Sequence, residues 1–171
     1  MTATEHGTGK ARGSAADGWA ARLEGSNISP TSLLATDYLN HYNEVIMIVD
    51  MLPDMPEMLE DIAGWRPRSY AEHFRDCGFS YAELAIEAYE HAPAQFRRIF
   101  DDTREKLDEM TLYAIRTLAG CIASRRESEL RERCAVFARA MQSLADTMAA
   151  TINGNATKAD DNLIHSIIGR R

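Results

Sequence analysis

Residues 128–148 read SELRERCAVFARAMQSLADTM. Apolar residues recur in this stretch in alternating steps of four and three, at Leu130, Cys134, Phe137, Met141, Leu144 and Met148. This spacing places all six on one face of an α-helix and is typical of a helix–helix contact in a bundle. The pair Asn153–Gly154 is a common helix end. The stretch therefore predicts a long amphipathic helix over residues 128–153.

The same periodicity recurs upstream of this stretch. Pro93 is expected to start a second long helix that continues to about Ser124. Ser69 and Glu72 have the spacing of a capping box and predict a helix start at residue 69, with a stop at Gly78 and a continuation to His91. Ser29–Pro30 predicts the start of a first long helix, whose inward positions are Leu34, Tyr38, His41, Val45, Ile48 and Leu52.

These helices define the predicted fold class and domain organisation. We expect an all-α protein whose residues 30–153 form an antiparallel four-helix bundle, because long apolar-faced helices with short joints pack this way. Residues 1–29 are rich in Gly, Ala, Ser and Thr and are expected to form a flexible, disordered N-terminal arm. Residues 154–171 are expected to form a linker and a short C-terminal amphipathic helix.

The charge distribution excludes several classes of function. The chain has 171 residues and a formal charge of −7, and residues 30–65 contain seven acids with no Lys or Arg. Nucleic acids and anionic membranes require clustered cations, so neither is an expected partner. No apolar run is long enough to cross a bilayer, and the polar N-terminus lacks a secretory signal, which predicts a cytoplasmic protein.

A stripe of imidazoles and carboxylates is the best candidate for chemistry. His41 lies on the inward register of the first helix, with Asp37 and Glu44 on the same stripe. His73 and His91 follow on later segments, beside Glu72 and Glu87. If these segments share one pole of a bundle, the expected ligands of one divalent transition metal are His41, Glu44, His73 and His91, oriented by Asp37, Glu72 and Glu87. The alternative is that these groups form ordinary core hydrogen bonds and a solvated face.

The segment GWRPRSYAEHF (residues 64–74) resembles the DinB-like helical-bundle superfamily, in which a Trp and a Pro precede the second helix and a His on that helix binds a metal. The order of elements is also similar over most of residues 30–152. The resemblance implies a metal-ligand role for His73. The family's His-x-x-x-His on the last bundle helix is absent, since residues 128–152 contain no histidine, so the thiol-transferase or hydrolase chemistry of some members is not implied.

Three functions follow from these patterns. The favoured one is a non-catalytic binding or regulatory module that acts through a protein partner or as a homo-oligomer, with contacts from Leu163, Ile164, Ile167 and Ile168. The alternative is a metal-binding bundle protein or enzyme, a degenerate DinB-like protein with the site described above. A third is a small-molecule pocket lined by Tyr38, Tyr42, Trp65, Tyr70 and Phe74, although aromatic residues in such a core are more often packing. No catalytic residue can be assigned from the sequence.

Overall fold

The computed structural model describes residues 13–156 and 166–169. Within these ranges the chain is all-α, and its only pairing of extended backbone is an isolated bridge between Ile28 and Ala35. The elements are α1 (Gly13–Arg22), η1 (Thr36–Leu39), α2 (Asn40–Met51), η2 (Pro56–Met58), α3 (Leu59–Ile62), α4 (Tyr70–Cys77), α5 (Ala82–Glu90), α6 (Ala94–Ala123) and α7 (Glu127–Ile152).

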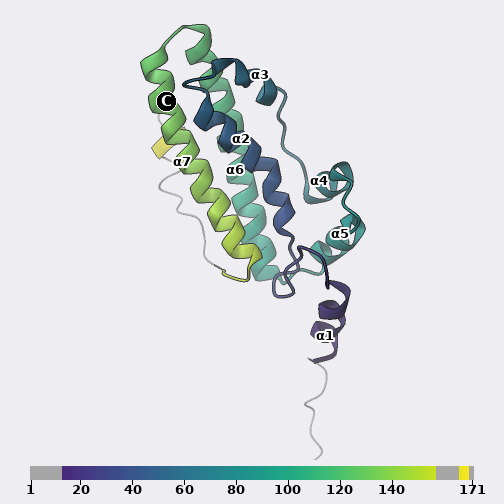
Figure 1. Cartoon of the computed structure of the whole chain (residues 1–171). Coiled ribbons are helices and arrows are strands. Elements are labelled where there is room, and N and C mark those ends of the chain that lie inside the picture. The colour runs from purple at the N-terminus through teal and green to yellow at the C-terminus, as the bar shows by residue number, and fades with distance from the viewer. Residues whose placement is uncertain (1–12, 157–165, 170–171) are drawn as a thin grey trace, which may run out of the picture.

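The two longest helices, α6 and α7, lie side by side and are joined at one end by residues 124–126 (Figure 1). Helix α2 packs against α7, and the short helices α4 and α5 pack against each other near the start of α2. Apolar side chains from all these helices form one core, whose largest fully buried members include Tyr38, Tyr42, Phe74, Phe100 and Phe137. The predicted inward positions of the 128–148 stretch are all buried in this core.

Several predicted helix ends are confirmed. Ser69 and Glu72 form a complete capping box, and Gly78 ends α4 with φ of +67°, a left-handed conformation that favours glycine. Helix α6 follows Pro93 directly, and α7 ends at Ile152 beside Asn153. The side chain of Ser80 does not cap α5, which begins after Tyr81.

The predicted helix start at Ser29–Pro30 is wrong. Leu33 has φ of +60°, and the Ser29 N–H donates a backbone hydrogen bond to the carbonyl of Leu34, so this segment forms a loop. The buried Ser32 hydroxyl donates to the carbonyl of Ile152 at the end of α7. That tertiary contact satisfies a helix-terminal carbonyl and outweighs the local capping signal, so regular helix begins only at η1.

The two ends of the chain contain helical segments within the described residues. Helix α1 lies in the segment predicted as an arm; its Trp19 packs against the core and the following Leu23 is buried. Near the C-terminus, residues 166–168 form a helical turn beside α7 (Figure 1). None of the described helices combines the length and the apolar character needed to cross a membrane.

Candidate functional site

Two of the predicted metal ligands lie together. His41 on α2 and His73 on α4 have ring centroids 5.9 Å apart in an edge-to-face arrangement. The His41 ring also stacks on the indole of Trp65, with centroids 4.8 Å apart and planes at 25°. The Trp65 indole N–H donates to the backbone carbonyl of His41 at 3.1 Å, which fixes the stack. Trp65 therefore holds the linker before α4 against the start of α2.

The orientation of His73 is set by the backbone of η1. Its Nε2 is 3.0 Å from the carbonyl oxygen of Asp37, an acceptor, so Nε2 carries the proton and Nδ1 is the acceptor nitrogen. The Cys77 sulfur is 3.8 Å from Nδ1. Burial lowers the pKa of His73, opposed by the hydrogen bond to Asp37, so the ring is neutral near pH 7.

The His41 ring has an unsatisfied nitrogen. Its Nε2 is buried and has no hydrogen-bond partner among the described residues. Burial lowers the pKa of His41 to about 4, with further lowering from His73 and Arg68, opposed by a hydrogen bond to the backbone of Arg66. His41 thus presents a bare acceptor in a neutral ring, a state that a metal ion or a hydrogen-bond donor would satisfy.

The remaining predicted ligands and orienting residues do not join this pair. Glu44 is exposed on the outer face of α2. His91 follows α5, where its Nδ1 contacts the carbonyl of Glu87 at 2.9 Å and its ring lies 5.4 Å from that of Trp19. No group of three His, Cys, Asp or Glu side chains with metal-binding geometry occurs in the described part of the chain. The predicted convergence of His41, Glu44, His73 and His91 at one pole is therefore not found.

Each predicted orienting carboxylate has another role. The Asp37 carboxylate accepts hydrogen bonds from the Tyr81 hydroxyl and the Asn27 amide. Glu72 completes the capping box of α4, where its Oε2 accepts from the Ser69 N–H at 2.8 Å. Glu87 forms a two-point ion pair with Arg22 of α1. These carboxylates hold helix ends and α1 in place and do not bond to an imidazole nitrogen.

The aromatic residues predicted to line a pocket pack against one another. Tyr38 stacks on Tyr70 with centroids 5.4 Å apart, and Tyr70 lies 4.7 Å from Phe74. Tyr42 lies 6.0 Å from Tyr38 and 5.9 Å from the half-buried Trp65. The four Tyr and Phe side chains are 0–3% exposed, so this cluster is core and not the wall of an open cavity.

A buried polar network that connects this aromatic cluster to α6 was not predicted from the sequence. The Tyr42 hydroxyl donates to Oδ1 of Asp108 at 2.7 Å, and Nη1 of Arg104 lies 3.3 Å from Oδ2. Burial raises the pKa of Asp108, and the Tyr42 hydrogen bond and the Arg104 charge oppose that shift. The i,i+4 spacing of Arg104 and Asp108 was visible in the sequence, but the inward direction of Asp108 depends on its partner in α2.

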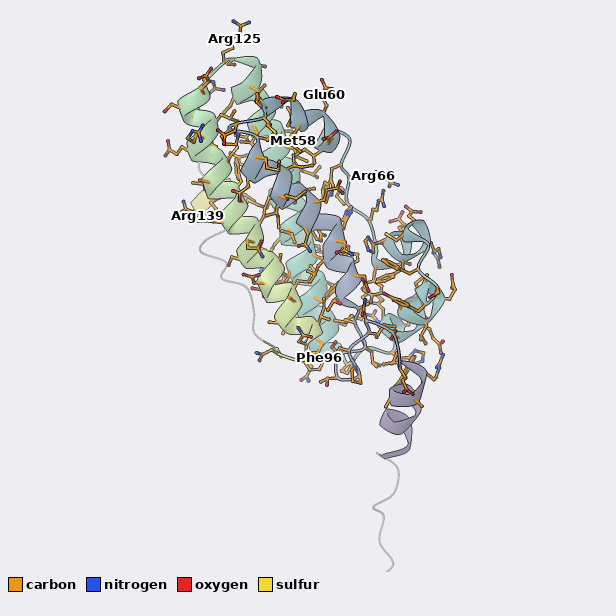
Figure 2. The ribbon with its side chains drawn as sticks, in the orientation of Figure 1. Met58, Glu60, Arg66, Phe96, Arg125 and Arg139 are labelled. Carbon is orange, nitrogen blue, oxygen red and sulfur yellow. The ribbon has the colours of Figure 1, made fainter. Side chains whose placement is uncertain are left out.

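A groove on α6 and α7 was also missed. It encloses about 710 Å³, and its apolar lining comes from Tyr113, Val136, Phe137 and Ala140. Charged residues at its sides are Glu129, Glu132, Arg133 and Arg139. Figure 2 places Arg139 on the outer side of α7, next to the C-terminal turn.

The C-terminal turn forms one wall of this groove. Ser166 and Ile167 line it, and the half-buried Ile167 and Ile168 pack against the core. Leu163 and Ile164, predicted with them as partner contacts, lie outside the described residues. The two described isoleucines therefore make contacts within their own chain.

Comparison of the chain with protein-family models, with curated proteins and with solved structures gives no match.

Proposed function

We propose that this protein is a non-catalytic binding module, and that the α6–α7 groove receives an apolar helical segment of a protein partner or of a second copy. The observation that carries the proposal is the open groove itself: about 710 Å³ of space bordered by Tyr113, Val136 and Phe137. Concave apolar grooves of this kind recognise the apolar face of an amphipathic helix. The C-terminal turn completes the groove, since Ser166 and Ile167 form one of its walls.

The charges around the groove support recognition by shape and apolar contact. Glu129 and Glu132 are matched by Arg133 and Arg139, so the lining carries no net charge. Glu129 is further neutralised by ion pairs with Arg126 and Arg133. We therefore expect the affinity for a helical peptide to change little with salt concentration.

The test is a selection from a library of short helical peptides, with the full-length protein as bait. We expect enriched peptides to carry apolar residues at i and i+3 or i+4, and to lose binding when the bait carries Val136→Asp in the groove. The matched control is Met47→Asp, which places the same charge on a methionine that is 54% exposed on α2. Peptides that bind all three baits equally would contradict the proposal.

A metal-binding function is the second candidate, and it rests on the unsatisfied Nε2 of His41 beside His73. The geometry supports it less well, because no third His, Cys, Asp or Glu of the described residues joins these two imidazoles in a group that could hold a metal ion. Thermal unfolding with and without Zn²⁺, together with elemental analysis, tests it. A rise in melting temperature that His41→Phe removes would favour a metal site, and no rise would eliminate it.

The resemblance of residues 64–74 to the DinB-like superfamily is part of the same proposal. We infer a degenerate member that keeps Trp65 and His73 and lacks the last-helix histidines. We further propose that α2, α6 and α7, with the α4–α5 pair in the fourth position, correspond to an antiparallel four-helix bundle. An experimental structure tests this arrangement directly.

A further inference from the structure

We infer that the α7 wall of the groove orients its partner: the bound helix runs antiparallel to α7 and carries an acid that is followed, seven positions later, by a base. This orientation rests on the proposed function, since it specifies the charge pattern and the direction of the helix that the groove receives. It follows from two exposed charges of the lining, Glu132 and Arg139.

Four charged side chains of α7 line the groove, and two of them neutralise each other. The Nε of Arg133 donates to Oε1 of Glu129 at 2.6 Å. Glu132 and Arg139 are exposed, and neither has an ion-pair partner among the described residues. The Nε of Arg139 donates to the carbonyl of Ala135 at 3.0 Å, which occupies one of the guanidinium donors. Glu132 and Arg139 are therefore the charges that a partner can neutralise.

Val136 lies between these two charges on the same stripe of α7. Glu132, Val136 and Arg139 are at positions i, i+4 and i+7, and this spacing puts them on one face of a helix. At 1.5 Å per residue, the two charged positions are about 10.5 Å apart along the axis, which is about two turns. The wall of the groove thus presents an anion, an apolar centre and a cation in the N-to-C direction of α7.

A partner helix that lies along this wall must place a base opposite Glu132 and an acid opposite Arg139, since the reverse arrangement brings like charges together. A helix is more stable when its acid precedes its base, because this order matches the helix dipole. A partner with that order meets both charges only when it runs antiparallel to α7. We therefore expect an acid, an apolar residue three or four positions later to contact Val136, and a base at the seventh position.

The two charges set the direction of the partner more than its affinity. An exposed ion pair changes a binding constant by about twofold to fivefold. Arg139→Gln should weaken binding of a matched helix by this factor, and a helix whose acid is already replaced by Gln should show no further loss. Arg98→Gln is the matched control, because this exposed residue near the start of α6 does not line the groove.

The experiment uses the tightest helical peptide selected with the full-length native protein as bait. A nitroxide label on the N-terminus of this peptide broadens nearby amide signals of the ¹⁵N-labelled protein. On the native chain we expect broadening around Arg139 and Ala140. On the charge-exchanged variant, Glu132→Lys with Arg139→Glu, we expect the same label to broaden signals around Glu129 instead, because the peptide reverses its direction. Circular dichroism and thermal unfolding verify that the variant is folded.

Other outcomes separate oriented docking from the proposed function. Selected helices without the acid–base order, or a label that broadens the same residues on both proteins, would overturn the orientation, although the groove retains its proposed role. A label that broadens signals around Glu129 on the native chain would overturn it as well. Equal losses of affinity with Arg139→Gln and Arg98→Gln would show that no ion pair forms at Arg139. If no helical peptide binds the native protein, both proposals fail.

Discussion

The imidazole of His41 stacks on the indole of Trp65, with ring centroids 4.8 Å apart, while its Nε2 is left without a hydrogen-bond partner among the described residues. This pair joins the start of α2 to the linker before α4. It stabilises the fold through ring contact, yet a buried, unsatisfied acceptor costs about 1–3 kcal/mol. The same residue therefore has opposing effects on stability, and their balance depends on pH.

Acid should destabilise the protein through His41. Its folded-state pKa of about 4 is lower than the unfolded value of about 6.5, so the unfolded state binds more protons between these values. The contribution of the neutral His41 ring to the free energy of unfolding is complete above about pH 6.5 and is lost as the pH falls towards about 4. We expect the free energy of unfolding to decrease by about 1–2 kcal/mol between pH 7.5 and pH 5. Urea titrations at both pH values measure this decrease.

The control for this effect is His41→Phe, which keeps an aromatic ring on Trp65 and removes the titrating group. We expect the variant to be at least as stable as the native chain at pH 7.5, because the unsatisfied acceptor is gone. Its loss of stability at pH 5 should be smaller than that of the native chain. An identical pH dependence in both proteins would show that His41 does not carry the effect.

Removal of the Tyr42 hydroxyl should be costly. Tyr42→Phe deprives the buried Asp108 carboxylate of a hydrogen bond of 2.7 Å and leaves only Arg104 as a partner. We expect a loss of about 1–3 kcal/mol in the free energy of unfolding. Tyr81→Phe is the control, because its hydroxyl contacts the more exposed Asp37 and should cost less. Chemical denaturation that gives the same loss of unfolding free energy for Tyr42→Phe and Tyr81→Phe would contradict a larger cost at the buried Asp108 site.

The two serines before the short helices should differ in their effect. Ser69→Ala removes the side-chain cap of α4 and should lower the free energy of unfolding by about 1 kcal/mol. Ser80→Ala, at an exposed position that caps no helix, should change it by less than about 0.5 kcal/mol. Denaturant midpoints compare them directly, and a larger effect at Ser80 would refute the assigned helix start.

Two glycines should respond oppositely to alanine. Gly154 has φ of +91°, and a Cβ there would come within 2.8 Å of Thr31 Cγ2, so Gly154→Ala should cost more than about 1 kcal/mol. Gly120 lies inside α6 with only the end of the Arg126 side chain nearby, at 3.9 Å. Gly120→Ala should therefore raise stability by about 0.5–1 kcal/mol. Melting temperatures that move in the same direction for both variants would contradict this assignment.

Periodic and capping patterns predicted most of the helices. The 4–3 spacing from Leu130 to Met148 and the Ser69 capping box are local signals that tertiary contacts reinforce. The loop at residues 29–35 was not predictable, because Ser32 contacts Ile152, which is 120 positions away in the chain. No local pattern encodes such a contact.

The candidate site was predicted only in part. Inward registers correctly indicated that His41 and His73 lie near the core, since both follow the apolar face of their helices. His91 does not join them because it follows the end of α5, where its ring lies beside Trp19. Glu44 does not join them because it points outward from α2. Both positions depend on how α2, α4 and α5 pack, which the sequence pattern does not specify. The groove depends on the return of the chain to α7, which the sequence does not specify.

The most direct test of a binding role for the groove is amide chemical-shift mapping on the ¹⁵N-labelled full-length protein during titration with a library-selected helical peptide. The proposed function predicts that the largest shifts fall on Tyr113, Val136, Phe137 and Ala140, together with a change at Ile167 in the wall of the groove. Shifts centred on the acidic outer face of α2, around Glu44 and Asp50, or no shifts in α6 and α7, would contradict it.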